Sequence, residues 1–226
     1  DTSDEWIVPR TGIHTRPVST GETATDLAAA AGRRALGWEG GAGLAPARPI
    51  EAAGIDLVIC MTLTGDTLIP SQAALVKARL GLPNAVAFDL NAACAGCVYG
   101  LVTAQSMMAA AHAPGWAGNP VRRALVIGVE RMSRIVDWTD RATCVLFGDG
   151  AGAVLLEWDD ARTGIVSSYV KNTDDTGLSL ACGKNFDLAS FPFGAEAAAS
   201  GEGADATAGP GADLSRDTIV HDEHAR

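Results

Sequence analysis

Cys94 is the residue of this chain that is best placed to act as a nucleophile. An apolar run over residues 85–88 predicts a short buried strand, and an alanine-rich stretch over residues 95–112 predicts a long helix, so Cys94 lies where the strand gives way to the helix. The first turn of a helix has unpaired N–H groups and the positive end of the helix dipole, which stabilise a thiolate. The small residues Ala93 and Gly96 leave room for a substrate. An unpaired cysteine is often a buried core residue, so both interpretations stay open at this point.

The other cysteines do not indicate a disulfide framework or a metal site. Their odd number and their apolar surroundings are typical of a reducing cytoplasm. Cys94 and Cys97 form a C-x-x-C pair, but a redox or zinc site would need a thioredoxin-like context or a second ligand pair, and the sequence has neither. Phosphate-loop and H-E-x-x-H patterns are also absent, so the sequence predicts no metal site. The five cysteines are at positions 60, 94, 97, 144 and 182.

The composition is that of an acidic chain with enough apolar residues for a large core. Of the 226 residues, 47% are hydrophobic and 5% aromatic, and the formal net charge is −10. Half of that charge, −5, comes from residues 181–226, where eight acidic residues outnumber three basic ones. This balance disfavours nucleic-acid binding. We see neither an uninterrupted membrane-spanning run nor a secretory leader, so we expect no membrane contact and a cytoplasmic location.

Strand and helix patterns alternate along the chain, which predicts the α/β class. Continuous apolar runs predict buried strands of a parallel or mixed sheet, and Thr20, Ser71 and Gly81 are expected at helix ends. Residues 1–21 are polar and are expected to be irregular. The longest helix is apolar nearly all round, so we expect it to be central rather than on the surface. The predicted strands are 55–63, 85–88, 124–129 and 164–170, and the predicted helices are 22–36, 71–80 and 95–112.

Four segments together resemble beta-ketoacyl-acyl carrier protein synthase III, the condensing enzyme that initiates type II fatty acid synthesis. Their order and spacing also match, and the likeness covers about residues 1–180. The opening segment is the most specific, whereas the glycine-rich one occurs across the wider thiolase-like superfamily. The segments are Thr2–Ile13 (TSDEWIVPRTGI), Asn91–Gly96 (NAACAG), Asp140–Thr143 (DRAT) and Leu146–Ala153 (LFGDGAGA).

The resemblance implies a thiolase-like layered fold, of which this chain supplies mainly the N-terminal half: a mixed sheet with a buried central helix. Such proteins are usually homodimers. Cys94 matches the family nucleophile, which takes an acyl group from coenzyme A. Malonyl-acyl carrier protein is then decarboxylated, and its carbanion attacks the thioester to give a 3-oxoacyl product. The resemblance implies coenzyme A thioester as a substrate and no permanently bound cofactor or metal.

The resemblance also implies a site for the nucleotide of coenzyme A. Trp6 can stack on the adenine ring, and Arg10 offers a fork of donors to phosphate or adenine. Arg141 and Thr2 match family positions beside the same nucleotide. As an alternative, Trp6 is a surface anchor and the two arginines pair with neighbouring carboxylates, namely Asp4, Glu5 or Asp140.

Three apolar residues match family positions around the acyl group. Met132 and Phe147 match residues that line the acyl pocket, and Ile69 matches a residue that reaches across the dimer into the partner's pocket. All three could equally be ordinary core residues.

The chain departs from the family where the rest of the active site is expected. The family uses a histidine in a His-Gln-Ala-Asn-like segment and an asparagine in a Gly-Asn-Thr-like segment, and neither segment occurs here. We therefore expect residues 1–182 to form the N-terminal half, with the C-terminal half outside this chain and little activity for the chain alone. Residues 183–226 are expected to be an acidic connecting or disordered segment, and residues 37–54 look like an insertion. We predict solvated or capping roles for the four histidines, His14, His112, His221 and His224.

Three other interpretations remain open on the sequence. One is a related thiolase-fold condensing enzyme that makes polyketide, alkylquinolone or hydroxymethylglutaryl products. Another is a noncatalytic module that binds acyl-coenzyme A or a carrier protein, for which the missing histidine and asparagine would be natural. A third, a dimerising fragment with an inert buried cysteine, depends on the burial of Cys94.

Overall fold

The computed structural model describes residues 2–40, 46, 48–162, 164–174, 177, 180–182 and 219–221. The chain divides into two compact units, and each is described by itself. The sheet unit consists of residues 17–131 and 148–171, and the N-terminal unit consists of residues 1–16, 132–147 and 172–226.

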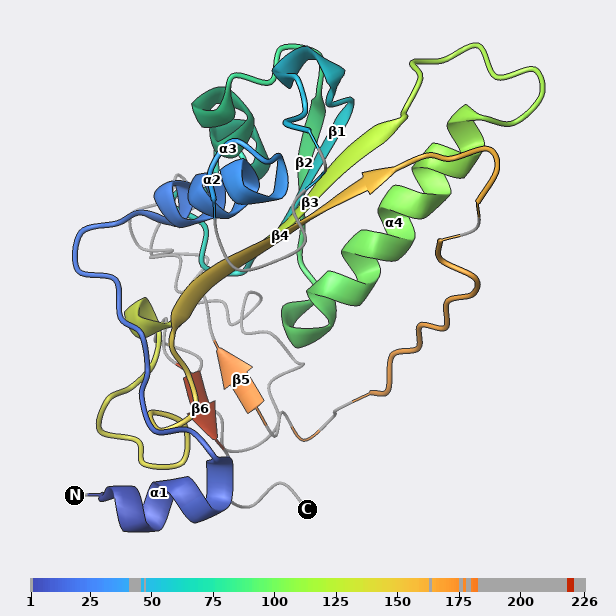
Figure 1. The fold of residues 1–226 in the computed structure, drawn as a ribbon. Coiled ribbons are helices and arrows are strands. Elements are labelled where there is room, and N and C mark those ends of the chain that lie inside the picture. Colours follow the sequence, from blue (N-terminus) through green and yellow to red (C-terminus); the bar gives the residue numbers. More distant parts are fainter. Residues whose placement is uncertain are drawn as a thin grey trace, which may run out of the picture. The chain divides into compact units, whose positions relative to one another are not determined.

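The sheet unit is built on a four-stranded mixed sheet with the strand order β2-β1-β3-β4 (Figure 1). Strand β1 pairs in parallel with β2 and β3, so that Leu57 lies opposite both Val86 and Ala124. Strand β4 runs antiparallel to β3. The predicted α/β class and mixed sheet are therefore confirmed, although β4 is absent from the predicted strands. The bounds are β1 Leu57–Met61, β2 Val86–Leu90, β3 Arg123–Arg131 and β4 Asp149–Glu157.

Helices cover both faces of this sheet. Helices α2 (Ala24–Ala35) and α3 (Gln72–Leu80) lie on one face, and α4 (Gly96–Ala111) lies on the other (Figure 1). Successive side chains of a strand point to opposite faces, so β1 contributes to two cores. Its even-numbered members, Val58 and Cys60, pack with α2 and α3, and its odd-numbered members pack with α4.

Capping residues explain where α2 and α3 begin and where α3 ends. The Ser71 side chain caps α3, and Gly81 ends it with a positive φ of 64°, as predicted. The carboxylate of Asp89, at the end of β2, also accepts the first two N–H groups of α3 at 2.7 and 2.6 Å. Helix α2 is capped by Thr23, so the predicted cap at Thr20 is wrong.

Helix α4 is apolar on most sides but is not central among the described residues. Val98 is 50% exposed, so one side of the helix packs on the sheet and the rest is open. Among the described residues, the predicted burial is found on the side of α4 that packs on the sheet. Within the described ranges, one helical stretch, Ala93–Ala111, is long and apolar enough to cross a membrane, judged by length and composition only. The core helices of soluble proteins pass the same test, so this finding is weak evidence for a membrane span. Four α4 residues at helical spacing are buried, Gly96, Gly100, Ala104 and Met108.

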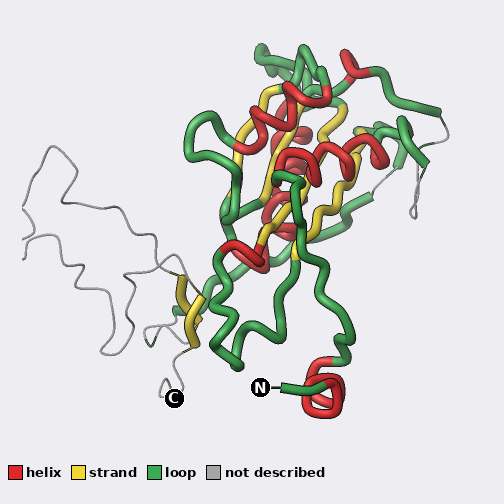
Figure 2. The backbone as a smooth tube through the Cα atoms, turned by 90° about the vertical axis from the view of Figure 1, so that its left-hand side faces the viewer, coloured by secondary structure: helices red, strands yellow, loops and turns green. Residues whose placement is uncertain are grey.

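The N-terminal unit begins with helix α1 (Asp4–Thr11), where the sequence predicts irregular structure. That prediction is wrong because α1 depends on its ends: acidic residues fill the first turn, and Gly12 closes the helix with a φ of 71°. Figure 2 shows α1 as the red helix beside the N-terminus. The 3-10 helix η3 spans Met132–Arg134, and β5 (Leu180–Cys182) pairs antiparallel with β6 (Ile219–His221).

Three other sequence predictions have mixed outcomes. Residues 164–170 form no strand in their described part, and Val166 is 85% exposed. The predicted connecting segment 183–226 lies outside the described residues except for β6. In the predicted insertion 37–54, the indole of Trp38 donates to the Ile50 carbonyl at 2.6 Å, which ties that loop together.

Candidate active site

Cys94 lies in a short connection between the sheet and the long helix, as the sequence predicts. Strand β2 ends at Leu90, the 3-10 helix η2 spans Ala93–Ala95, and α4 begins at Gly96. The Cys94 side chain is exposed. A buried core role therefore does not fit Cys94, and its sulfur is open to a reactant.

The backbone turns sharply just before this cysteine. Ala93 has a φ of 44°, in the left-handed region that residues with a side chain rarely adopt. Its N–H donates to the side-chain oxygen of Asn91 at 3.3 Å, and the N–H of Ala95 donates to the Ala92 carbonyl at 3.0 Å. Strained backbone of this kind costs of order 1–3 kcal/mol and is frequent at active sites. Here it redirects the chain from β2 into α4.

Close packing fixes the start of α4 against the sheet. A Cβ atom on Gly100 would lie 2.5 Å from the sulfur of Met61, and one on Gly96 would lie 3.1 Å from the Met61 Cβ. Only glycine lets the helix approach β1 this closely. The start of α4 thus lies beside Met61, which is the last residue of β1. In open α/β sheets, ligands bind beyond the carboxyl ends of the strands.

A hydrogen-bonded carboxylate, Glu130, ties together the ends of β1 and β3. It accepts the N–H groups of Leu63 and Thr64 at 2.9 and 3.1 Å, and the Thr64 hydroxyl also donates to it. Burial raises the pKa of Glu130, and these hydrogen bonds oppose the shift. Sequence reasoning missed this residue, because a lone glutamate at the end of a strand has no distinguishing pattern.

The N-terminal unit brings three predicted nucleotide-binding residues together. The guanidinium carbon of Arg141 lies 3.9 Å from the centroid of the Trp6 ring, and that of Arg10 lies 4.6 Å from it. Arg10 also donates to the carbonyl of Trp6 at 2.9 Å. Both guanidinium groups lie over an aromatic face, where cation–π attraction is favourable. Thr2 is exposed just before α1.

Arg16 joins the two segments that carry these residues. Its Nε donates to the Val145 carbonyl at 2.8 Å, and its side chain also donates to the Ile13 carbonyl at 3.0 Å. Val145 itself is buried. These bonds link the segment that follows α1 to the segment that carries Arg141.

The alternative interpretation of the two arginines is not found in the structure. Among the ion pairs of the described residues, none joins Arg10 or Arg141 to a neighbouring carboxylate. Asp140 instead accepts the N–H of Ala142 at 2.9 Å and the hydroxyl of Thr143 at 2.5 Å. Trp6 is half-buried and keeps its ring next to both guanidinium groups.

The three residues predicted around the acyl group lie in different units. Ile69 belongs to the sheet unit and is 90% exposed, next to Leu68, which is 65% exposed. Met132 and Phe147 belong to the N-terminal unit and are half-buried. Ordinary core packing therefore does not describe Ile69, and the pocket role of all three stays a prediction.

The described histidines have no catalytic surroundings. The Nδ1 atom of His112 lies 2.8 Å from the Met108 carbonyl, and its ring stacks on Trp158 with 4.3 Å between centroids. His14 is exposed. These contacts agree with the predicted capping and solvated roles. The side chains of His221 and His224 lie outside the described residues.

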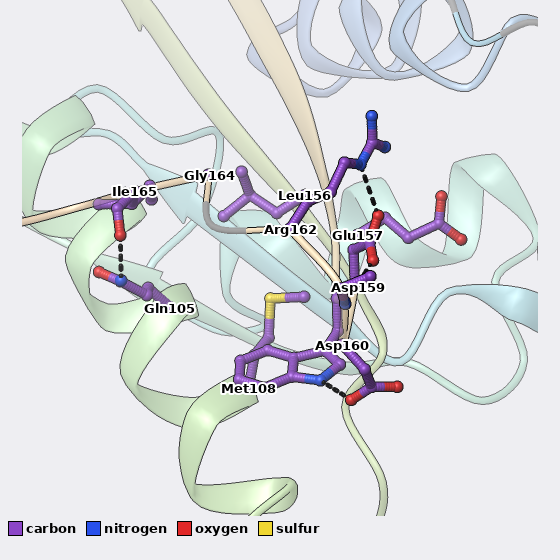
Figure 3. Close-up of a pocket in the computed structure, with 11 residues that line it drawn as sticks. Gln105, Met108, Leu156, Glu157, Asp159, Asp160, Arg162, Gly164 and Ile165 are labelled. Carbon is purple, nitrogen blue, oxygen red and sulfur yellow. Dashed lines mark hydrogen bonds and ion pairs between the residues drawn. The ribbon is translucent and has the colours of Figure 1, made fainter.

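A pocket of about 420 Å³ lies between the C-terminal part of α4 and the segment after β4 (Figure 3). Its polar groups are already paired: Arg162 with Asp159 at 2.7 Å, and the Trp158 indole with Asp160 at 2.7 Å. None of the residues predicted to take part in function lines it.

Comparison with known proteins gives consistent matches over part of their length. Residues 88–174 match the family model described as 3-Oxoacyl-[acyl-carrier-protein (ACP)] synthase III. Proteins named beta-ketoacyl-[acyl-carrier-protein] synthase III from Clostridium beijerinckii and Alkalilimnicola ehrlichii are 41% and 45% identical to this chain. The alignments cover 87% and 86% of this chain but 54% and 52% of those relatives. The chain thus spans about half the length of the curated relatives it matches.

Solved structures agree with the similarity to the synthase III proteins. The 3-oxoacyl-[acyl-carrier-protein] synthase III from Aquifex aeolicus matches with a TM-score of 0.61 and 41% identity, over 70% of this chain and 46% of that chain. The priming beta-ketosynthase of the R1128 polyketide biosynthetic pathway matches with a TM-score of 0.69 and 30% identity, over 98% of this chain and 55% of that chain. The predicted resemblance and the thiolase-like α/β fold are confirmed.

Proposed function

We propose that this chain, a relative of the beta-ketoacyl-[acyl-carrier-protein] synthase III proteins, carries the acyl-accepting cysteine of an enzyme that starts fatty acid synthesis. The observation that carries this proposal is the exposed Cys94 at the start of α4, behind a strained turn. The enzyme is an acyltransferase that condenses an acyl-coenzyme A primer with malonyl-acyl carrier protein. We place it in the cytoplasm, without a permanent cofactor.

The reaction follows from the chemistry of a thiolate. The Cys94 sulfur attacks the thioester carbonyl of the primer, and the coenzyme A thiolate leaves and takes up a proton. Malonyl-acyl carrier protein then loses carbon dioxide, and the resulting carbanion attacks the acyl-Cys94 carbonyl. The C–C bond forms as the C–S bond breaks, which returns the Cys94 thiolate and leaves a 3-oxoacyl group on the carrier protein.

The Trp6, Arg10 and Arg141 cluster is proposed to bind the nucleotide end of coenzyme A. The Trp6 ring offers a flat aromatic face for adenine, and stacking on such a face tolerates any base. The two guanidinium groups can donate to phosphate or to ring nitrogens, and Thr2 can add a hydroxyl. The close contact of Arg141 with Trp6 supports this role, because it is the kind of contact that a bound purine can replace.

Acyl-group selection is proposed to involve Met132, Phe147 and Ile69. Ile69 is 90% exposed beside Leu68, which is 65% exposed, and this adjacent pair of exposed apolar side chains supports a role for Ile69 across a homodimer interface. The remaining catalytic histidine and asparagine are expected outside this chain, since residues 1–182 are proposed to be one half of the protein.

A condensation assay tests the proposal on the natural protein in which this chain occurs. With acetyl-coenzyme A as primer, we expect a 3-oxoacyl product from malonyl-acyl carrier protein and none from the Cys94→Ala variant. A product formed only from malonyl-coenzyme A would contradict the assigned acceptor and place the protein with another condensing branch.

Polyketide priming is the second candidate function. It is favoured by the match to the R1128 priming ketosynthase, which covers 98% of this chain at 30% identity. A carrier protein from a polyketide pathway, compared with the fatty acid carrier in the same assay, separates the two. A noncatalytic acyl-coenzyme A module would bind coenzyme A and form no product with either carrier.

A further inference from the structure

Arg16 joins the two segments that carry the proposed nucleotide site, and the proposed function gives this residue no role. Trp6 belongs to α1, whereas Arg141 lies among turns at residues 141–146. Arg16 and its partner Val145 are 129 residues apart in the sequence. The contact of Arg141 with the Trp6 ring therefore depends on what holds these two distant segments together.

All three nitrogen atoms of the Arg16 guanidinium group donate to backbone carbonyls. Nε and Nη2 donate to the Val145 carbonyl, Nε at 2.8 Å, and Nη1 donates to the Ile13 carbonyl at 3.0 Å. Among the ion pairs of the described residues, none includes Arg16. The planar guanidinium group holds its donors in a rigid fork, so it fixes the two carbonyls relative to each other. These contacts suit a residue that holds protein segments rather than a ligand.

On one side of Arg16, hydrogen bonds fix the Ile13 carbonyl relative to α1. The Thr11 hydroxyl donates to the Ile7 carbonyl at 3.0 Å, and it accepts the N–H of Ile13 at 3.1 Å. The chain beyond α1 is therefore tied back to the helix that carries Trp6. A movement of Ile13 would break these bonds or move the helix with it.

On the other side, hydrogen bonds fix the Val145 carbonyl relative to Arg141. The carboxylate of Asp140 accepts the N–H of Ala142 at 2.9 Å and the hydroxyl of Thr143 at 2.5 Å. These bonds fold the backbone around Arg141 into a tight turn. Val145 follows this turn within two residues and is buried, so it is a firm attachment point.

Arg16 closes these links into a ring of contacts. The segment with Trp6 ends at one carbonyl that Arg16 holds, and the segment with Arg141 ends at the other. The two segments meet again where the guanidinium carbon of Arg141 lies 3.9 Å from the centroid of the Trp6 ring. Removal of Arg16 opens this ring and leaves the contact between Arg141 and Trp6 without its support.

We propose that Arg16 is a positioning residue, which holds Arg141 over Trp6 and thereby sets the preference of the enzyme for thioesters that carry the nucleotide of coenzyme A. The proposal rests on the proposed function, because the Trp6 and Arg141 cluster must bind that nucleotide. A site whose side chains are already held loses less conformational freedom when its ligand binds. Without Arg16 this loss falls on the binding step, so binding of the nucleotide weakens.

The test compares acetyl-coenzyme A with acetyl-pantetheine, which lacks the nucleotide, as primers for the natural protein. Arg16→Ala should raise KM for acetyl-coenzyme A by about threefold to tenfold and leave kcat unchanged, because only binding of the nucleotide is affected. KM for acetyl-pantetheine should stay the same. Arg16→Lys keeps the charge and can reach one carbonyl, so its KM should lie between the two. Arg134→Ala, which removes an exposed arginine of the same unit, is the matched control.

A double-variant cycle shows whether Arg16 acts through Arg141. In an Arg141→Ala background, Arg16→Ala should raise KM for acetyl-coenzyme A no further, since the group that it holds is gone. Additive effects, or equal losses with both thioesters in Arg16→Ala, would overturn the proposal. Thr11→Val loosens the same ring at another point and should also raise KM. If Arg16→Ala does not fold, an unchanged KM in both Arg16→Lys and Thr11→Val would overturn the proposal.

Trp6→Ala and Arg141→Ala separate this inference from the proposed function. If these two variants lose the preference for acetyl-coenzyme A and Arg16→Ala keeps it, the positioning role alone is refuted. If they keep the preference, the cluster is not the nucleotide site, and that part of the proposed function fails. Calorimetric binding of coenzyme A to the same variants makes this comparison without acyl transfer, so it holds even if the protein forms no condensation product.

Discussion

The Trp6 ring shows how single residues of this chain prepare a binding surface. Two cationic side chains lie within 5 Å of its centroid, contributed by α1 and by a segment far along the sequence. The sequence resemblance supplied these three residues, but only the structure shows that Arg10 and Arg141 contact the ring rather than the neighbouring carboxylates. Glu130 is the opposite case, since no sequence pattern predicts a carboxylate whose role depends on backbone N–H groups of the loop that follows β1.

Replacing Trp6 by alanine should weaken the use of coenzyme A thioesters. Stacking of one base on an aromatic ring is worth about 1–3 kcal/mol, so kcat/KM for acetyl-coenzyme A should fall by about tenfold to a hundredfold. An acetyl thioester without the nucleotide should react as before. Trp138→Ala, which removes an exposed tryptophan of the same unit, is the control. Equal losses with both thioesters would show that Trp6 supports the fold rather than the nucleotide.

The raised pKa of Glu130 predicts a pH dependence of stability. An acid whose pKa is raised in the folded state adds stability at low pH, which is lost as the pH rises through the folded pKa. The free energy of unfolding of the unaltered chain, relative to Glu130→Gln, should therefore fall as the pH rises above the ordinary pKa of a glutamate side chain. Urea titrations at a series of pH values measure the difference. A difference that grows with pH would mean that hydrogen bonds lower the pKa of Glu130 more than burial raises it.

At the level of elements, the sequence predicts best where capping and apolar runs coincide. Helix α3 has both a serine cap and a glycine stop, and the inner strands are continuous apolar runs, so these elements are found near their predicted bounds. Strand β4 was missed because its glycine-rich start looks like a turn, and it forms because all nine of its residues pair with β3. Helix α1 has no apolar periodicity, and its end signals alone were too weak to predict it.

The packing of α4 on β1 gives a prediction at this scale. Replacement of glycine by alanine inside a helix ordinarily adds up to about 1 kcal/mol of stability. At Gly100 the new methyl group would collide with Met61 and Val126, so Gly100→Ala should instead lower the free energy of unfolding by about 1–3 kcal/mol.

Ser106→Ala, on the exposed side of the same helix, is the matched control and should leave stability nearly unchanged. Alkylation of Cys94 by a small haloacetamide should also change in Gly100→Ala, because the start of α4 is displaced. A stabilised Gly100→Ala variant with unaltered Cys94 reactivity would show that α4 does not depend on this close approach.

For the whole molecule, the central fact is that the chain matches about half of its relatives' length. An apolar helix with one side open agrees with a fold in which a further layer covers it, which is why the sequence predicted a central helix. Hydropathy reports how apolar a helix is, not which elements cover it, so the sequence alone could not predict that the described sheet covers one side of α4.

This chain, expressed by itself, should therefore self-associate. Exposed apolar surface along α4 drives association, so light scattering should show a mass that rises with concentration. Val98→Ser should reduce the effect, whereas Val18→Ser, at a similarly exposed valine in a loop, should not. A monomer at all concentrations, with cooperative unfolding, would show that the open side of α4 is tolerated in water.

The covalent step at Cys94 is the most direct test of the account. The natural protein is incubated with acetyl-coenzyme A, and its intact mass is measured before and after treatment with hydroxylamine, which cleaves thioesters. We predict the gain of one acetyl group that hydroxylamine removes, its retention in Cys97→Ala and its loss in Cys94→Ala. No acetyl gain in the unaltered protein, or a gain that persists in Cys94→Ala, would contradict the assignment of Cys94 as the acyl-carrying nucleophile.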